Sequence, residues 1–317
     1  MSRILTFGEP LIIHYLPEPI LTSESNSFLS LGGSEINTSI SLANNNHQVY
    51  LLSSLPDNKL GQEFLEILEH RNIETQYIHL SNEHQLIGSM YVKNQGVIYQ
   101  RQYSCFSFFN VMNIDLDNIF EENFNWCHLT GITPLLSVSI ALLWKEILNN
   151  CFIYQIPVSI DLNYRPALGE FHELWRIVKP IVSKLELFII SISDILLISK
   201  FEHLDMSTLN LEQQLVLLAD KLSINKLVTC QKQILEDGSQ NRCSYLVYKH
   251  KIYKSKIKNH TPIEHIGGGD AFVGSLINSV LRNSSNENLD NQITEILNQS
   301  DYYTIDTQNE RGNFPKF

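Results

Sequence analysis

The sequence predicts an α/β fold in which helices cover both faces of a mostly parallel central sheet. Short apolar runs alternate along the chain with longer segments whose apolar residues recur at helical spacing. Continuous apolar runs are typical of parallel strands, because such strands are buried on both faces of the sheet. One segment breaks this alternation. Residues 87–103 have the pattern of a β-hairpin around a turn at residues 93–96, and we expect them to protrude as a lid.

The expected elements follow in order along the chain. Strands of the sheet are predicted at residues 4–7, 49–52, 126–129, 158–162, 187–190 and 226–230. Helices are predicted at residues 60–70, 138–148, 174–184 and 211–222, after a first helix opened by residues 31–37 and before another that follows residue 270. Residues 12–32 are expected to form loop and short strands, and residues 244–254 a second hairpin. Pro180 should kink its helix or mark a helix start.

Size and charge narrow the classes of protein to consider. A chain of 317 residues has room for one large domain, and 43% hydrophobic with 18% charged residues is a globular composition. The net charge of −11 argues against a nucleic-acid partner, which requires a basic face. No apolar run is long enough to span a bilayer, and the first residues lack the apolar region of a signal peptide. The five scattered cysteines predict reduced thiols in a cytoplasmic protein.

Three consecutive glycines, Gly267, Gly268 and Gly269, precede Asp270 and an apolar pattern of helical period. The free N–H groups and the dipole of a helix N-terminus attract anions. A carboxylate beside such a site can accept the proton of a hydroxyl, as phosphoryl transfer to an alcohol requires. A tight turn that only starts a helix, with Asp270 as an ordinary first-turn residue, explains the same residues equally well.

Other candidates for chemistry follow the predicted strands. Parallel α/β sheets bind their ligands beyond the carboxyl ends of the strands. Glu9, Ile132 and Arg165 are expected at that edge, each shortly after a predicted strand. The diglycine at residues 32–33 opens a helix, where it either lets a ligand touch the backbone or makes a tight entry turn.

Six motifs together resemble one family, the ribokinase-like (PfkB-type) carbohydrate kinases. Residues 32–37 are similar to its GG-x-x-x-N element, and residues 267–274 to its G-A-G-D-x-F-x-G signature. Within the family the resemblance is greatest to the 2-keto-3-deoxygluconate (KDG) kinases. It lies in residues 55–61, 97–101, 129–134 and 161–166, and in the GGGD form of the glycine loop.

The resemblance implies a ribokinase-like three-layer α/β/α sandwich with a small β-sheet lid. It covers the chain from about residue 4 to 314, so we expect a single domain over residues 1–317, with lid segments at about 12–32 and 87–104. It implies ATP and Mg²⁺ as cofactors and phosphorylation of the terminal hydroxyl of a sugar acid such as KDG. Members of the family commonly dimerise through the lid sheet, so a homodimer is expected too.

The resemblance also implies roles for residues at matching positions. Asp270 would be the general base, beside an anion hole formed by the three glycines. A carboxylate of the substrate needs a guanidinium partner, which Arg101 and Arg165 would supply, because arginine pairs with carboxylates bidentately. The alternative is that Arg101 and Arg165 are surface or ion-paired residues. The implied substrate pocket contains Gly33, Asn37, Tyr91, Tyr99, Arg101, Ile132 and Arg165, and the implied nucleotide site Asn163, Gly267, Gly269 and Tyr302.

Several positions depart from the family pattern on the nucleotide side. The family's Asn-x-x-Glu, which organises Mg²⁺ through water, is matched by Ser191 and Asp194 in one register, whereas a register one residue later places Ile195 at the acidic position. Glu264 and His265 replace the usual residues before the glycine loop. Tyr302 stands on a late helix where small residues normally flank adenine, and Gly169 stands near a position where tryptophan is usual.

These departures keep two alternatives open. A neutral-ketose kinase such as a fructokinase belongs to the same family, but it has no need of two arginines for a carboxylate. A sugar-acid-binding protein without kinase activity would tolerate the changed nucleotide side. Nucleoside kinases of the superfamily fit the motifs less well.

Overall fold

A computed structural model describes residues 1–16, 28–93, 96–263, 266–283 and 289–309 of the chain. Its main sheet has the strand order β14-β13-β12-β11-β10-β9-β1-β4-β5, with β6 paired to β4 and β15 to β13. The strands from β12 to β5 run parallel to their neighbours, and β13, β14 and β15 are antiparallel. The strands are β1 (Arg3–Phe7), β4 (Gln48–Pro56), β5 (Ile73–Glu74), β6 (Ile78–Ser81), β9 (Trp126–Thr130), β10 (Val158–Asp161), β11 (Leu187–Ile189), β12 (Lys226–Ile234), β13 (Gln240–Tyr248), β14 (Lys251–Lys254) and β15 (Lys258–His260).

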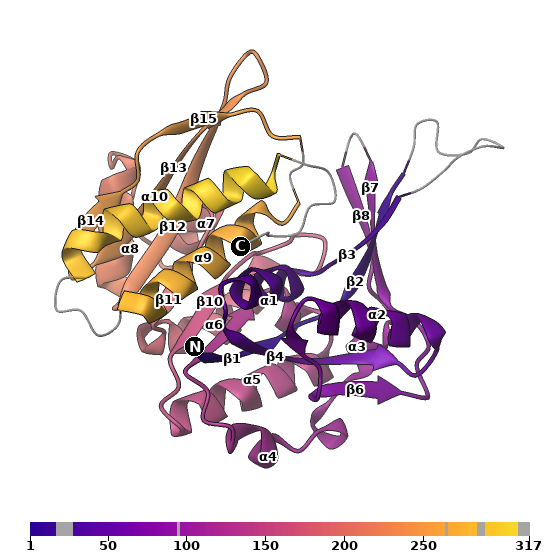
Figure 1. The fold of residues 1–317 in the computed structure, drawn as a ribbon. Coiled ribbons are helices and arrows are strands. Elements are labelled where there is room, and N and C mark those ends of the chain that lie inside the picture. The colour runs from indigo at the N-terminus through magenta and orange to yellow at the C-terminus, as the bar shows by residue number, and fades with distance from the viewer. Residues whose placement is uncertain (17–27, 94–95, 264–265, 284–288, 310–317) are drawn as a thin grey trace.

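Helices cover both faces of this sheet (Figure 1). One layer consists of α1 (Ser34–Asn44), α2 (Lys59–His70), α9 (Gly268–Asn283) and α10 (Leu289–Thr307). The other contains α3 (Cys105–Phe108), α4 (Leu116–Phe120), α5 (Val138–Ile153), α6 (Phe171–Val178), α7 (Ile192–Phe201) and α8 (Leu211–Leu222). Each layer packs its own apolar cluster against one face of the sheet. The predicted three-layer α/β/α sandwich with a mostly parallel sheet is confirmed.

A second sheet of four strands stands out from the body as the lid, at the upper right of Figure 1. It contains β2 (Leu11–Tyr15), β3 (Phe28–Gly32), β7 (Gly88–Lys93) and β8 (Gly96–Gln100), in the order β3-β2-β7-β8. Leu11, Ile13, Tyr15 and Met90 form a small apolar cluster on one of its faces. Both predicted lid segments therefore contribute strands. One face of the lid sheet borders the carboxyl edge of the main sheet.

All six predicted sheet strands are present. The helix predicted at residues 211–222 is found with the same ends, and the other predicted helices have shifted ends. Residues 174–184 divide into α6 and a 3-10 helix, η3 (Lys179–Lys184), with Pro180 in the first turn of η3. Proline thus marks the start of a new segment, because it cannot donate the hydrogen bond that would continue α6. The second hairpin is correct in β13 and β14, whose turn places Lys249 and His250 at positive φ.

Several short elements between residues 104 and 125 were not predicted. They are α3, η1 (Val111–Asn113) and α4, none longer than five residues. A helical period cannot be recognised over so few residues. Helix α7 was also missed, since its apolar side chains are distributed around the helix rather than on one side.

The five cysteines are free thiols, and Cys105, Cys127, Cys151 and Cys243 are buried. Burial raises the pKa of Cys105 to about 12, and hydrogen bonding to Cys151 together with burial raises that of Cys127. These thiols stay protonated near neutral pH. Among the described residues, no helix combines the length and the apolar character needed to cross a bilayer.

Candidate active site

A cavity of about 400 Å³ lies beyond the carboxyl ends of β1, β9 and β10, between the lid and the N-terminus of α9. We call it the glycine-loop cavity. The lid contributes apolar and aromatic side chains, and the sheet edge contributes polar ones. Its lining residues are Leu11, Ile13, Gly33, Ser34, Asn37, Met90, Val97, Tyr99, Arg101, Ile132, Asp161, Asn163, Arg165, Lys232, Ile266, Gly267, Gly269 and Asp270.

The glycine loop gives this cavity an anion-attracting end. Gly267 has φ +77°, a conformation that side-chain-bearing residues rarely adopt, and α9 begins at the next residue. The first N–H groups of a helix have no partner within the helix. A Cβ at Gly269 would meet no atom within 4 Å, so packing does not require a glycine there, and the space beside it is open to a ligand.

Asp270 is held in this loop by two neighbours on α1. Ser34 Oγ donates to its Oδ1 (2.6 Å), and Asn37 Nδ2 donates to its Oδ2 (2.7 Å). Burial raises the pKa of Asp270 to about 6, and Glu35 adds to this; the two hydrogen bonds and the charge of Arg165 oppose the rise. A carboxyl group with this pKa is ionised at neutral pH and can accept a proton from a hydroxyl.

The hydrogen-bond chain continues from Ser34 to the end of β10. Asn163 Nδ2 donates to Ser34 Oγ (3.1 Å), and Asn163 N donates to Asp161 Oδ1 (3.1 Å). Asn163 has φ +40°, so the chain turns sharply after the strand and brings Asp161 and Asn163 to the same cavity. Burial and the nearby charges of Asp270 and Asp194 raise the pKa of Asp161 to about 7.

Arg101, at the end of the lid, is ion-paired with the body of the protein. Its Nε donates to Oε2 of Glu9, whose Oε1 accepts from Ser104 Oγ (2.5 Å). Glu9 is 1% exposed and Arg101 8%. Gly33, at φ +121°, lies so close to Glu9 that a Cβ there would stand 2.4 Å from its carbonyl oxygen. Part of the guanidinium is thus already committed to a carboxylate of the protein.

A second cavity, of about 290 Å³, adjoins the first along Asp161, Asn163, Arg165, Lys232 and Gly269. It extends toward α7, and we call it the α7 cavity. Asp194 borders it, whereas Ile195 is fully buried in the core. The structure therefore favours the register that matches Ser191 and Asp194 to the family's Asn-x-x-Glu. Ser191 N and Oγ both donate to Asp194 Oδ2 (2.7 Å each), which caps α7.

Comparison with known families decides the class of protein. Residues 2–290 match the model of the pfkB family carbohydrate kinases. The chain belongs to the pfkB family of carbohydrate kinases. A curated 2-dehydro-3-deoxygalactonokinase of Haloferax volcanii is 24% identical over 288 residues, covering 88% of this chain and 85% of that protein.

Solved structures of carbohydrate kinases share the fold. A 2-dehydro-3-deoxygluconokinase of Thermotoga maritima superposes with a TM-score of 0.88 at 21% identity, covering 100% of this chain and 95% of that one. A fructokinase of Vibrio cholerae with bound fructose, ADP and calcium superposes with a TM-score of 0.77 at 17% identity, covering 99% and 95%. Kinases named for sugar acids and for a neutral ketose therefore share this architecture.

The structure brings most of the predicted site residues of this kinase to the two cavities. Tyr91 and Tyr302 lie elsewhere. Tyr91 alternates with Met90 on β7, so it faces away from the cavity that Met90 borders, and its ring stacks on His14. Tyr302 is 55% exposed on α10, and its ring contacts the ammonium group of Lys258. Gly268 is buried against the side chain of Gln308, and Glu264 and His265 lie outside the described residues.

Among the lining residues that were not predicted as site residues are Ser34, Asp161 and Lys232, and Glu9 beside them was not predicted either. Ser34 and Asp161 stand inside recognised motifs, so their neighbours could have pointed to them. Glu9 was placed at the ligand edge, but its pairing with Arg101 depends on a lid contact distant in sequence. Lys232 lies in a polar run beyond the predicted strand 226–230, which carried no signal.

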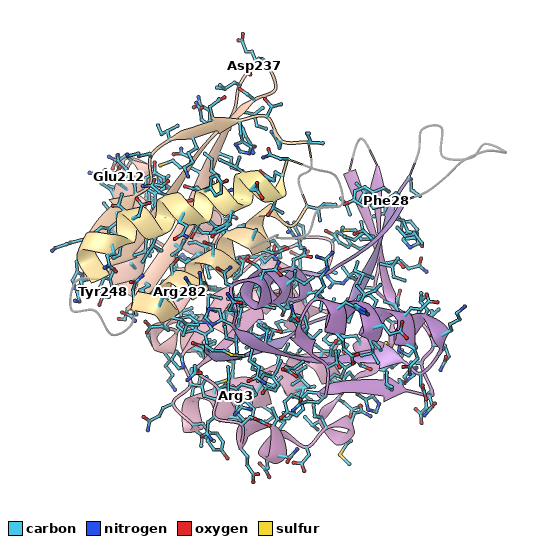
Figure 2. The ribbon with its side chains drawn as sticks, in the orientation of Figure 1. Arg3, Phe28, Glu212, Asp237, Tyr248 and Arg282 are labelled. Atoms are coloured by element: carbon cyan, nitrogen blue, oxygen red, sulfur yellow. The ribbon has the colours of Figure 1, made fainter. Side chains whose placement is uncertain are left out.

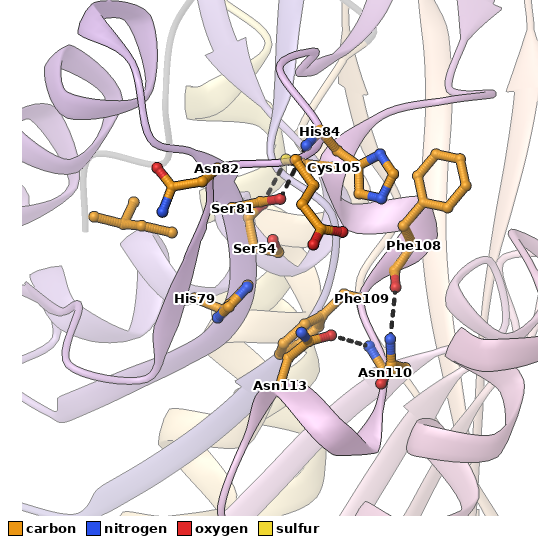
Figure 3. A pocket seen from close by; sticks show the side chains of 12 residues that line it. Ser54, His79, Ser81, Asn82, His84, Cys105, Phe108, Phe109, Asn110 and Asn113 are labelled. Carbon is orange, nitrogen blue, oxygen red and sulfur yellow. Dashed lines mark hydrogen bonds between the residues drawn. The ribbon is translucent and has the colours of Figure 1, made fainter.

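A third cavity, of about 260 Å³, lies at the base of the lid and shares no lining residue with the other two. Figure 3 shows His84 beside Phe108, and His79 on the opposite side near Phe109. Cys105 also borders it, with Sγ donating to the carbonyl oxygen of Ser54 (3.3 Å). The cavity is formed by the two segments that connect the lid to the body.

Proposed function

We propose that this carbohydrate kinase transfers the terminal phosphoryl group of ATP to the terminal hydroxyl of a sugar acid, KDG in the first place. The observation that carries the proposal is the glycine-loop cavity, which places a carboxylate, a helix N-terminus and the Arg165 guanidinium around one space. Sugar kinases of the family use ATP and a divalent metal ion, and the resemblance in residues 161–166 supports a sugar acid.

Asp270 acts as the general base in this proposal. Its carboxylate takes the proton of the sugar hydroxyl as the hydroxyl oxygen forms a bond to the γ-phosphorus. The bond from the γ-phosphorus to the bridging oxygen breaks, and ADP leaves. The N–H groups of Gly267, Gly268 and Gly269 stabilise the charge on the transferring group. Ser34 and Asn37 hold the carboxylate in place, and Asn37 and Gly33 lie where sugar hydroxyls are expected.

The α7 cavity suits the metal ion that accompanies ATP. Mg²⁺ prefers carboxylate oxygens and keeps several of its own waters. Asp161 accepts one hydrogen bond from the described residues, from Asn163 N, so it retains free acceptor positions toward the cavity. Asp194 adds a second carboxylate. These two residues would hold Mg²⁺, which supplies charge neutralisation on the phosphates.

Charge around the glycine-loop cavity supports a sugar acid over a neutral sugar. Arg165 borders the cavity, and its side chain has no ion-pair or hydrogen-bond partner among the described residues. Its guanidinium is therefore available for a carboxylate. Arg101 is different, because Glu9 neutralises it. We assign the main carboxylate contact to Arg165, and to Arg101 only the donor groups that Glu9 leaves free.

A substrate panel tests the proposal directly. Purified protein is incubated with ATP, Mg²⁺ and KDG, fructose, ribose or gluconate, and ADP release is measured. KDG should be the preferred substrate. Preference for fructose would replace the sugar acid by a neutral ketose. Binding of KDG without turnover of any sugar would favour a binding protein in place of the kinase.

Two further parts of the proposal concern assembly and compartment. The lid exposes Phe28, Leu29, Val97 and Ile98, and Phe28 stands at its margin in Figure 2. Exposed apolar strands invite pairing with another chain, so we propose a homodimer through the lid. Light scattering that shows only monomer at high concentration would contradict it. Five free thiols fit a reducing compartment such as the cytoplasm.

A further inference from the structure

Two cations face each other on the wall of the α7 cavity. Lys232 of β12 and Arg242 of β13 are direct cross-strand partners, and both border the cavity. Side chains opposite each other on neighbouring strands share a face of the sheet, and like charges in that arrangement destabilise the strand pair. A negative charge close to the two side chains would therefore stabilise this arrangement.

Arg242 has its own counter-ion within the protein. Its Nε donates to Asp301 Oδ1 (2.5 Å), and Asp301 also accepts from Ser244 Oγ (2.6 Å) and Ser255 Oγ (2.5 Å). The guanidinium packs over the ring of Phe272, at 5.1 Å from its centroid. Arg242 is 1% exposed, and its Nη1 has no hydrogen-bond partner among the described residues. It is a fixed positive charge at the back of the cavity.

The ammonium group of Lys232 has no ion pair or hydrogen bond with any described residue. It stands on the part of β12 that extends beyond β11 at the carboxyl edge of the sheet. Desolvation by the cavity walls is the main effect that lowers the pKa of Lys232, and the charge of Arg242 adds to it, although the side chain stays accessible to water. Both effects disfavour an unpartnered ammonium group, and an anion in the cavity would relieve them.

The position of Lys232 indicates which anion. It borders both cavities, as do Gly269 and Arg165. A phosphate chain lying in the α7 cavity with its end at the glycine loop would pass this lysine. The protein as a whole has a net charge of −11, so its general field repels a polyphosphate, and local cations must supply the attraction.

We propose that Lys232 binds the phosphate chain of the phosphoryl donor where the α7 cavity meets the glycine-loop cavity, with Arg242 as a fixed charge behind it. This inference rests on the proposed kinase activity. It assigns a residue outside every motif of the sequence to recognition of the donor rather than of the sugar.

Calorimetric titration with ADP and with adenosine separates phosphate contacts from base contacts. Lys232→Met should weaken ADP binding about 10- to 100-fold, as expected for the loss of one charge-assisted contact. Adenosine binding should be unchanged, because adenosine has no phosphate. Lys232→Arg should restore most of the ADP affinity. Lys221→Met, which removes an exposed lysine of α8, is the matched control and should bind ADP as the wild type does.

Other outcomes overturn the inference in distinguishable ways. Wild-type ADP affinity in Lys232→Met would remove Lys232 from donor recognition and leave the kinase proposal intact. Loss of KDG affinity with normal ADP affinity would assign the lysine to the sugar acid instead. Loss of ADP affinity through Lys232 in a protein that phosphorylates fructose and not KDG would support the inference and overturn the substrate. Failure of the wild type to bind any adenine nucleotide would overturn both.

Discussion

The end of the glycine-loop cavity that holds Asp270 and the wall that this cavity shares with the α7 cavity differ in how their charges are balanced. At the end that belongs to the glycine-loop cavity alone, Asp270 and Arg101 already have partners in the protein. Asp270 accepts from Ser34 and Asn37, and Arg101 is paired with Glu9. On the wall that the two cavities share, the Lys232 ammonium group has no partner among the described residues, and Asp161 keeps free acceptor positions.

The difference bears on what each cavity can recognise. Groups that are fixed by hydrogen bonds before a ligand arrives position reacting atoms at little cost. Unpartnered charges instead attract a ligand of opposite charge and gain most when it binds. The end with Asp270 therefore has the character of a reaction site, and the shared wall that of a binding site for a charged, metal-associated group.

The largest effect is expected at Asp270. Asp270→Asn removes the proton acceptor and preserves the shape of the side chain, so turnover should fall about 10²- to 10⁴-fold with little change in sugar affinity. Steady-state kinetics measure the first and calorimetry the second. Asp220→Asn, an exposed position of α8, serves as the control. Near wild-type turnover in Asp270→Asn would exclude the carboxylate as the base.

The second effect is on stability and concerns the Arg101–Glu9 pair. Arg101→Ala leaves Glu9 charged and buried, which should reduce the free energy of unfolding by about 3–5 kcal/mol. The double variant Glu9→Gln with Arg101→Met removes both charges and should be clearly more stable than the single one. Urea unfolding compares them with Arg176→Ala, an exposed control on α6. Equal stability of single and double variants would contradict the role of the pair.

A smaller effect is expected at Arg165. Arg165→Ala should weaken KDG binding about 10- to 100-fold through loss of a charge-assisted contact. A neutral analogue of KDG without the carboxylate should bind the wild type at least as weakly as KDG binds the variant. Because Arg165 borders both cavities, ADP affinity is measured in parallel and should change less. Unchanged KDG affinity would argue for a neutral ketose.

Within the neutral range, a change of pH should alter kcat/KM less than the substitutions above alter turnover or affinity. A base with a pKa of about 6 is ionised above that pH. Below pH 6, kcat/KM should therefore fall about tenfold for each unit by which the pH decreases. The profile should be flat on the alkaline side of pH 7 until another group titrates. A profile that stays flat down to pH 5 would show that Asp270 does not need to be ionised.

Asp161 should make the stability of the fold fall as the pH rises, whereas kcat/KM rises with pH. Its pKa is about 7 in the folded protein and about 3.9 in an unfolded chain, so the folded state binds the proton more tightly. The contribution of this group is fully present below about pH 4 and is lost as pH rises through about 7. Asp161→Asn should therefore raise Tm by roughly a few degrees at pH 8 and leave it unchanged at pH 4. An equal change at both pH values would contradict this linkage.

Much of the fold was predictable because its signals are local and repeated. Each buried parallel strand is a short apolar run, and the glycine loop stands directly before its helix. The candidate site was predictable where it lies within motifs, as for Asp270 and Arg165. It was not predictable where a contact joins distant segments. The pairing of Arg101 with Glu9 and the cross-strand position of Lys232 depend on strand register and lid placement, which no local pattern contains.

Because four of the five cysteines are buried, the native thiols should react little with labelling reagents. Thiol reagents attack the thiolate, and burial keeps Cys105 and Cys127 protonated and covered. A single cysteine introduced at Gln102, which is exposed shortly after lid strand β8, would therefore react first with a maleimide dye. Once the half-buried Cys230 has been replaced by serine, fluorescence from that position would report any movement of the lid when a sugar or a nucleotide is added.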